Sequence, residues 1–292
     1  MILVAGATGY LGSEICRRLI ARGDAVRGLA RPTSDSATVT RLRDLGVEVV
    51  EGDLREAQSL GAACQGVAAV VSTATTTRSR QPGDSIEATD QQGQLNLIDA
   101  AKRAAVKHFV FISYSGQIGT DDPLTTAKRT AERRLRESGI TFTILRPSVF
   151  MEVWLSPAFG FDYANARATI FGSGERKISW VSLSDVAELA VRSIDAPAAR
   201  NATIELGGPE ALSPNEVIRM FEAATGRQFE VERVPEEALR AQEKAATDSL
   251  TKSFAALQLA YAKGDEIPMD DTLKRYPMKL RSVREYVEGT TG

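Results

Sequence analysis

Gly6-Ala7-Thr8-Gly9-Tyr10-Leu11-Gly12 is the stretch that decides the fold, with its glycines spaced G-x-x-G-x-x-G. It directly follows the apolar run Ile2–Ala5 and opens an amphipathic helical pattern that ends near Gly23. Glycines between a buried strand and a helix let backbone N–H groups approach a pyrophosphate, and the helix N-terminus adds partial positive charge. This placement predicts a dinucleotide-binding unit. The expected contacts in it are Gly6, Thr8, Gly9, Tyr10, Leu11 and Gly12.

Short apolar runs and helical patterns keep alternating through the first half of the chain. The runs are rich in Val, Ile and Phe and are bounded by turn residues, as buried strands are. They cover residues 2–5, 25–30, 47–51, 67–72, 109–113 and 142–145. Repeated strand–helix units predict an α/β fold, a doubly wound parallel sheet with helices on both faces.

The rhythm changes after about residue 150, where aromatic residues gather among prolines and glycines. Three later runs are expected strands: residues 177–181, 202–206 and 229–234. Ser213-Pro214-Asn215-Glu216 has the form of a capping box that starts a helix. We expect two domains. A NAD(P)-binding Rossmann domain covers residues 1–150, and a smaller α+β substrate-binding lobe covers residues 151–292, partly interleaved with the first.

Composition and charge exclude several classes of protein. The 292 residues are 43% hydrophobic, with 36 Lys and Arg against 38 Asp and Glu. A disordered chain would have fewer apolar residues, and a nucleic-acid binder would carry a basic excess. No apolar stretch approaches the roughly 18 residues that a membrane span requires, and no signal peptide is visible. With Cys16 and Cys64 as its only cysteines, the protein is expected in the cytoplasm, with a homodimer as one possible assembly.

The end of the second expected strand bears on which dinucleotide binds. An NAD-selective site places an acid there to hold the ribose 2′-hydroxyl, but this chain has Arg31 and no acid before Asp35. Arg31 can pair with a 2′-phosphate through charge-assisted hydrogen bonds, and Thr33 and Ser34 can add hydroxyl groups. The alternative is a surface arginine in a loop. Together these residues favour NADP(H) over NAD(H).

Two more strand ends face the same predicted crevice. Asp53, followed by Leu54, is placed to accept a hydrogen bond from the adenine amino group. The alternative is a helix N-cap aspartate, and the two roles can coexist. Ser72 and Thr73 end the fourth expected strand and face the crevice by the switch-point rule of doubly wound sheets.

These motifs resemble the short-chain dehydrogenase/reductase superfamily. They are most similar to its atypical NmrA-like branch, which includes isoflavone reductase-like enzymes, NADPH-dependent quinone reductases and redox-sensing regulators. The resemblance rests on residues 6–12, 31, 52–54, 90–101, 109–113 and 145–152, and it covers nearly the whole chain. It implies a Rossmann fold, a NAD(P)(H) cofactor and cofactor contacts from Pro147 and Phe150.

One departure from the superfamily changes the expected chemistry. Most members carry Tyr-x-x-x-Lys, whose tyrosine passes a proton to the carbonyl oxygen, but here Leu124 precedes Lys128 at that spacing. This counts against ordinary tyrosine-dependent carbonyl reduction. In isoflavone reductase-like enzymes the lysine of this helix contacts the nicotinamide ribose or transfers a proton, which the resemblance implies for Lys128. A desolvated lysine has a lowered pKa and can act as acid or base; the alternative is an exposed helix lysine.

Four further residues are candidates for contact with a substrate. Ser113 matches the strand-end serine that hydrogen-bonds the substrate oxygen in the superfamily, and Tyr114 is a substitute proton donor. Adjacent strand residues point to opposite faces, so both reach one substrate only if the strand has already ended. Phe150 and Trp154 would form an apolar wall for a flat substrate, with core packing as the alternative; Trp180 is expected in the core.

The sequence thus favours an NADPH-dependent reductase of a small apolar carbonyl, enone or quinone-like substrate. A different class, a non-catalytic NADP(H)-binding redox sensor that acts through a protein partner, is favoured by the missing tyrosine. A sugar-nucleotide epimerase or dehydratase also needs that tyrosine and is the least favoured. His108 is the only histidine, so a Ser-His-Asp triad and a typical zinc site are not expected.

Overall fold

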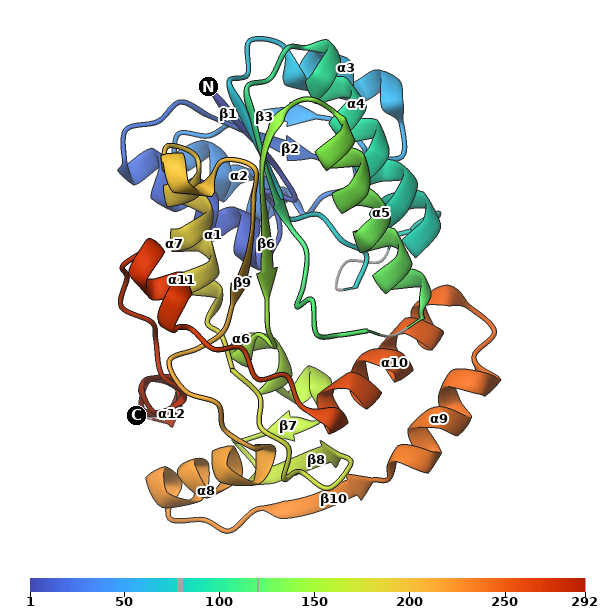
Figure 1. Cartoon of the computed structure of the whole chain (residues 1–292), viewed down its shortest axis with the longest axis vertical. Coiled ribbons are helices and arrows are strands. Elements are labelled where there is room, and N and C mark those ends of the chain that lie inside the picture. The colour runs from blue at the N-terminus through green and yellow to red at the C-terminus, as the bar shows by residue number, and fades with distance from the viewer. Residues whose placement is uncertain (78–80, 120, 292) are drawn as a thin grey trace. The chain divides into compact units, whose positions relative to one another are not determined.

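The computed structural model (Figure 1), which describes residues 1–77, 81–119 and 121–291, contains a seven-stranded sheet in the order β3-β2-β1-β4-β5-β6-β9. The strands are β1 (Ile2–Ala5), β2 (Val26–Ala30), β3 (Glu48–Glu51), β4 (Ala69–Ser72), β5 (His108–Ile112), β6 (Thr141–Pro147) and β9 (Ala202–Leu206). Neighbouring strands from β3 to β6 pair in parallel. The strand order reverses between β1 and β4, which confirms the predicted doubly wound sheet.

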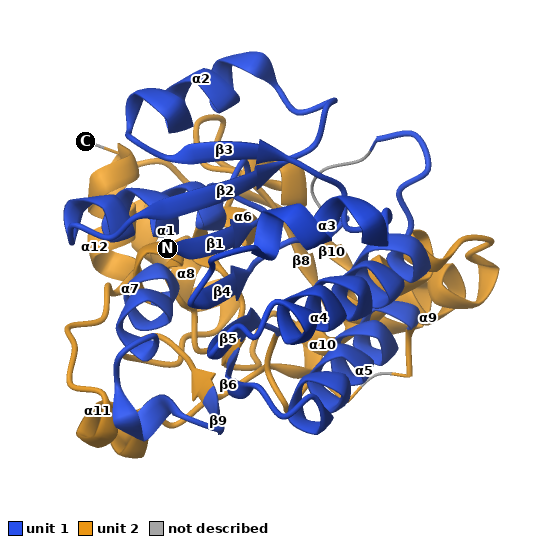
Figure 2. Cartoon of the chain, turned by 90° about the horizontal axis from the view of Figure 1, so that it is seen from above, with its two compact units in different colours: residues 1–113, 123–145, 186–204 blue, residues 114–122, 146–185, 205–292 orange. Residues whose placement is uncertain are grey.

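Helices cover both faces of this sheet (Figure 2). On one face lie α1 (Tyr10–Ala21) and α7 (Leu183–Ser193), and on the other lie α3 (Ala57–Cys64), α4 (Gln94–Arg103) and α5 (Pro123–Glu137), with α2 (Ser36–Asp44) beside β3. Strands β1, β4 and β5 are buried along their whole length. Burial on both faces explains why these runs read as continuous apolar segments rather than alternating ones.

A π-helix that the sequence pattern does not predict, η1 (Ile86–Gly93), leads directly into α4. The Ser85 side chain caps it by accepting a hydrogen bond from the Ala88 N–H. π-Helical turns are rare in proteins, and those that do occur are often found at functional sites. This one carries Asp90 at a fully buried position.

The chain divides into two compact units, each made of several segments (Figure 2). Unit 1 comprises residues 1–113, 123–145 and 186–204, and unit 2 comprises residues 114–122, 146–185 and 205–292. The expected division at residue 150 stays a prediction. No helix in the described part of the chain is long and apolar enough to cross a membrane.

Unit 2 contains a mixed three-stranded sheet in the order β10-β8-β7. Its strands are β7 (Phe161–Asp162), β8 (Arg167–Phe171) and β10 (Glu230–Val234), with β8 antiparallel to β7 and parallel to β10. Its helices are α6 (Met151–Trp154), η2 (Pro157–Phe159), α8 (Pro214–Thr225), α9 (Glu236–Ala245), α10 (Ser249–Lys263), α11 (Asp270–Arg275) and α12 (Val283–Thr291); η3 (Pro197–Ala199) belongs to unit 1.

Two local predictions in the second half have opposite outcomes. The capping box at the start of α8 is confirmed, because the Ser213 side chain accepts from the Glu216 N–H while the Glu216 carboxylate accepts from the Ser213 N–H. The expected strand over residues 177–181 is wrong. Its residues form only isolated bridges, in which Ile178 pairs with both Leu212 and Asp265. This extended segment joins several neighbours and enters no continuous ladder.

Candidate functional site

The glycine turn between β1 and α1 has no room for a side chain at Gly6 or Gly12. Gly6 has φ +85°, and a Cβ there would lie 2.5 Å from Thr73 Oγ1. A Cβ on Gly12 would lie 2.0 Å from the Gly6 carbonyl oxygen, and the Gly9 N–H donates to that same oxygen at 3.0 Å. The first turn of α1 carries no acidic residue. The tight turn at an unopposed helix N-terminus fits the pyrophosphate of a dinucleotide.

Other predicted cofactor contacts in this region differ in exposure. Tyr10, at the start of α1, is 66% exposed, which distinguishes it from the other large apolar side chains of the described residues. Ser72, in contrast, is fully buried at the end of β4 and donates to Gln94 Oε1 at 2.8 Å. Thr73 is half-buried, and its hydroxyl donates to the Ala5 carbonyl at 3.2 Å. The Ser72 side chain therefore holds the β4 end against α4.

Lys128 lies buried at the C-terminal end of β5 and beside η1. Its Nζ is 3.4 Å from the Ile112 carbonyl oxygen, 3.9 Å from Asp90 Oδ1 and 5.2 Å from the centre of the Phe111 ring. The other oxygen, Asp90 Oδ2, accepts hydrogen bonds from the Thr76 N–H at 3.0 Å and the Thr76 hydroxyl at 2.6 Å. Lys128 is only 5% exposed, so the alternative of a surface lysine is wrong.

This cluster has an unusual electrostatic state. Burial lowers the pKa of Lys128, and this effect exceeds the opposing attraction of Asp90 and Glu132, while Arg129 lowers the pKa further. Asp90 Oδ1 is the one buried side-chain nitrogen or oxygen of the described residues that accepts or donates no hydrogen bond. A buried ammonium group whose pKa is lowered thus faces a carboxylate oxygen that makes no hydrogen bond, an arrangement suited to proton transfer.

The Ser113 hydroxyl is hydrogen-bonded within the protein. It donates to Glu132 Oε1 at 2.7 Å and accepts from Arg129 Nη1 at 3.2 Å. Glu132 is 1% exposed and is paired with Arg129 at 2.6 Å and Arg136 at 3.4 Å. The single hydroxyl proton of Ser113 is committed to this carboxylate. Its role as a substrate ligand stays a prediction.

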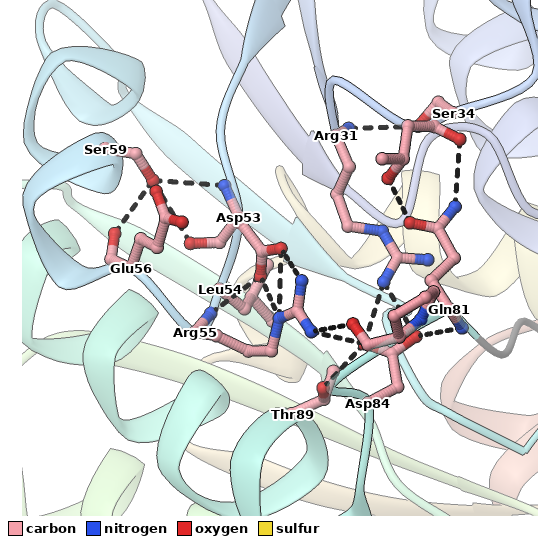
Figure 3. A network of polar contacts seen from close by, with 12 residues as sticks. Arg31, Ser34, Asp53, Leu54, Arg55, Glu56, Ser59, Gln81, Asp84 and Thr89 are labelled. Carbon is pink, nitrogen blue, oxygen red and sulfur yellow. Dashed lines mark hydrogen bonds and ion pairs between the residues drawn. The ribbon is translucent and has the colours of Figure 1, made fainter.

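Arg31 forms an ion pair that the sequence does not predict (Figure 3). Its Nη1 lies 2.9 Å and 2.8 Å from the two carboxylate oxygens of Asp84, whose side chain is 2% exposed. The backbone around Arg31 is fixed by Ser34, whose hydroxyl accepts from the Arg31 N–H at 3.0 Å. Arg31 is thus an ion-paired, partly buried residue and not a free surface arginine.

Asp53 is held by an arginine of its own loop (Figure 3). The Arg55 guanidinium donates to both carboxylate oxygens at 2.6–3.0 Å, and the Arg55 N–H donates to Oδ1 at 2.9 Å. Burial raises the pKa of Asp53, but the hydrogen bonds from Arg55 outweigh this, so the pKa is lowered. The N-cap alternative is wrong, because α3 begins at Ala57 with Glu56 as its N-cap. The neighbouring Leu54 is buried.

Aromatic side chains pack together in unit 2. Trp154 stacks on Tyr261 with ring centres 5.0 Å apart and lies 5.1 Å from Phe159. Trp180 is fully buried and donates from its indole N–H to the Leu212 carbonyl at 2.8 Å, which confirms its expected core position. Trp154 is half-buried at the edge of this cluster. Its role in substrate binding stays a prediction, as do those of half-buried Phe150 and Tyr114 and of buried Pro147.

Unit 2 also contains a buried carboxylate, Asp265. Its two oxygens accept from the Ser115 hydroxyl at 2.7 Å and the Ser148 hydroxyl at 2.6 Å. Burial raises the pKa of Asp265, although both hydrogen bonds act to lower it. Three segments that are distant in sequence meet at this residue, which therefore acts as a structural clasp.

His108 and the two cysteines have structural environments. The His108 ring nitrogens contact the Ile194 carbonyl at 3.0 Å and the Thr143 hydroxyl at 2.9 Å. Burial raises the pKa of Cys16 to about 12 and that of Cys64 to about 11, so neither is an activated thiol. Over residues 1–77, 81–119 and 121–291, no group of three or more His, Cys, Asp or Glu could hold a metal ion.

Sequence reasoning missed the partners of the residues that it selected. Asp90 lies in a motif that the resemblance includes, but its contact with Lys128 spans 38 positions of the chain, between η1 and α5. Asp84 lies in a loop with no periodic pattern, and Glu132 reads as one charge among many on α5. A four-residue spacing from Lys128 to Glu132 was the one available signal that both face the sheet.

Comparison with known proteins agrees with this geometry. A family model described as the NmrA-like family matches residues 1–287. An NAD(P)H azoreductase from Xenophilus azovorans is 34% identical over 229 residues, 78% of this chain and 74% of its own. A photosystem II assembly factor from Synechocystis is 29% identical over 276 residues, covering 93% of this chain and 79% of its own. The crystal structure of an NADPH-dependent quinone oxidoreductase from Escherichia coli, complexed with NADPH, matches with a TM-score of 0.81 and 23% identity over 100% of both chains.

The family match and the azoreductase similarity each cover most of the chain, while the likeness to the quinone oxidoreductase concerns the fold. The segments that carry the resemblance, residues 6–12, 31, 52–54, 90–101, 109–113 and 145–152, all lie within the matched range. The chain belongs to the NmrA-like family.

Proposed function

We propose that this protein is an NADP(H)-dependent reductase that acts on a small apolar carbonyl, enone or quinone-like substrate. The observation that carries the proposal is the buried Lys128, which lies beside Asp90 at the end of β5. The glycine turn follows β1, and a single strand, β4, lies between β1 and β5 in the sheet. The relatives named as an azoreductase and a quinone oxidoreductase support a redox reaction with a nicotinamide cofactor.

The cofactor would be held by residues of several strand ends. Backbone groups of residues 6–12 would bind the pyrophosphate, and Arg31 with Ser34 would bind the 2′-phosphate that distinguishes NADPH from NADH. The adenine would lie near Asp53 and Leu54. When bound, NADPH supplies the hydride.

Lys128 would supply the proton that the missing tyrosine gives in other members of the superfamily. Leu124 has no titratable proton, and the hydroxyl proton of Ser113 is held by Glu132. The lowered pKa of Lys128 makes its ammonium group a better acid than an exposed lysine. The negative charge of Asp90 raises the pKa of Lys128 and so offsets part of the effect of burial. Tyr114 remains a second candidate donor, with Phe150 and Trp154 as candidate substrate contacts.

The test is NADPH and NADH oxidation by the purified protein against a panel of quinones, enones and ketones. We expect turnover with NADPH, and Lys128→Ala should lower kcat by at least about 100-fold, the usual contribution of a general acid. Lys102→Ala is the matched control, because Lys102 is exposed on α4 and should keep wild-type rates. Cofactor Kd values measured by calorimetry separate lost chemistry from lost binding. Equal turnover by Lys128→Ala and wild type would remove Lys128 from the mechanism.

A second candidate is a non-catalytic NADP(H)-binding protein that acts through a protein partner. The similarity to a photosystem II assembly factor favours it, as does Leu124 in the tyrosine position. Tight NADPH binding without turnover across the panel would support this candidate against the reductase.

A further inference from the structure

Residues 81–84 of unit 1, which precede η1, contact Arg31 and its loop (Figure 3). The Gln81 side-chain oxygen accepts a hydrogen bond from the Thr33 hydroxyl. The Gln81 side-chain nitrogen donates to the Thr33 carbonyl at 3.0 Å. The Gln81 N–H donates to Asp84 Oδ2 at 2.9 Å. These contacts fix a turn that directs the Asp84 carboxylate onto Arg31.

Arg55 makes the same carboxylate part of a two-arginine arrangement (Figure 3). Its Nη1 lies 3.4 Å from Asp84 Oδ1 and donates to the Pro82 carbonyl at 2.9 Å. Gly83, with φ +83°, permits this approach, since a Cβ there would lie 2.8 Å from Arg55 Nη1. The Asp84 carboxylate therefore lies between two guanidinium groups, which is the arrangement that recognises a phosphate.

Among the described residues of this network, the guanidinium groups of Arg31 and Arg55 face the carboxylates of Asp84 and Asp53. A 2′-phosphate that paired with Arg31 would bring about two further negative charges close to Asp84. The like charges would repel, and the phosphate and carboxylate would need the same donors.

This inference rests on the proposed function. We propose that Asp84 is a specificity-determining residue that competes with the cofactor 2′-phosphate for Arg31 and Arg55. Arg55 is then a second cation of the 2′-phosphate site, in addition to Arg31. NADH has no 2′-phosphate, so Asp84 does not weaken its binding. Asp84 therefore reduces the ratio of the affinity for NADPH to the affinity for NADH.

The experiment measures Kd for NADPH, NADH, 2′,5′-ADP and 5′-AMP by calorimetry on the full chain with Asp84→Asn. Asparagine keeps the size of the side chain and an oxygen for the Gln81 N–H. We expect NADPH and 2′,5′-ADP to bind about tenfold more tightly, as for removal of one nearby like charge in a partly screened site. NADH and 5′-AMP should change less than about twofold. Asp84→Ser, which also removes the charge, should shift the same ligands in the same direction.

Asp99→Asn is the matched control. Asp99 pairs with Arg134 at 2.6 Å on an exposed surface of α4 and α5, so its loss removes the same charge from another aspartate–arginine pair. It should leave every Kd unchanged. An unchanged NADPH-to-NADH ratio in both Asp84 variants would overturn the inference while leaving the proposed function intact. Failure of the wild type to bind either dinucleotide would overturn the proposed function as well.

Discussion

Two buried aspartates, Asp265 of unit 2 and Asp90 of unit 1, have their hydrogen-bonding capacity satisfied differently. In unit 2, both oxygens of Asp265 accept short hydrogen bonds from serine hydroxyls. In unit 1, Asp90 has two donors from Thr76 on one oxygen and none on the other, which faces Lys128 at 3.9 Å. A fully satisfied buried polar group holds a structure together, whereas an open acceptor beside a cation retains capacity for a reaction. The comparison separates a structural clasp from a candidate reactive site.

We expect the largest effect from removing one of the two hydroxyl donors to Asp265. Ser148→Ala leaves one oxygen of Asp265 without its donor, which makes this aspartate resemble Asp90. We expect the free energy of unfolding to fall by about 2 kcal/mol, the usual cost of an unsatisfied buried group. Urea unfolding measures it. Ser173→Ala, at an exposed serine, should change stability by less than about 0.5 kcal/mol; an equally small loss for Ser148→Ala would mean that the clasp contributes little.

Neutralising the open carboxylate of unit 1 should affect catalysis more than stability. Asp90→Asn removes the charge that raises the pKa of Lys128, so the pKa should fall further. If Lys128 acts as an acid, the basic limb of the kcat–pH profile moves to lower pH, and kcat at neutral pH falls about tenfold, part of the 10²–10⁴ typical of acid–base catalysis.

The kcat–pH profile separates this role from a structural one, because a merely destabilised enzyme would keep its basic limb in place. Asp90→Glu restores the charge and should return the limb toward the wild-type position. An unmoved limb in Asp90→Asn would show that Asp90 does not act through Lys128.

The smallest effect concerns the pH dependence of stability. The folded pKa of Asp265 lies above its unfolded value of 3.8, so its favourable contribution is complete below that value and is lost as pH rises through the folded pKa. Asp265→Asn has no such loss. The stability of Asp265→Asn relative to wild type should therefore increase from pH 4 to pH 7 in urea titrations. A constant difference over this range would contradict the raised pKa.

Much of unit 1 could be predicted from sequence because its signals are local. Strand β1 begins and ends as predicted, since an apolar run stops at a glycine turn that only glycine can form. Strand β9 also has its predicted bounds, residues 202–206. Such features depend on neighbouring residues, which a linear pattern records.

The candidate site could be predicted only in part because its contacts are between distant residues. Lys128 and Arg31 could be chosen as candidates from the sequence, but their partners Asp90 and Asp84 lie in a π-helix and a loop without periodicity. The strand wrongly expected over residues 177–181 has the same cause, since its bonding partners come from separate segments. The sequence gives the type of each residue directly. The charged groups and hydrogen bonds around that residue depend on the tertiary structure.

The burial of both native thiols has a practical consequence. With pKa values of about 12 and about 11, Cys16 and Cys64 are scarcely ionised at neutral pH and lie in the core. We therefore expect the two native cysteines to react little with a maleimide, so that neither has to be replaced before labelling. A dye attached to Pro82→Cys, at an exposed position beside Arg55, would report directly on whether residues 81–85 move when a dinucleotide binds.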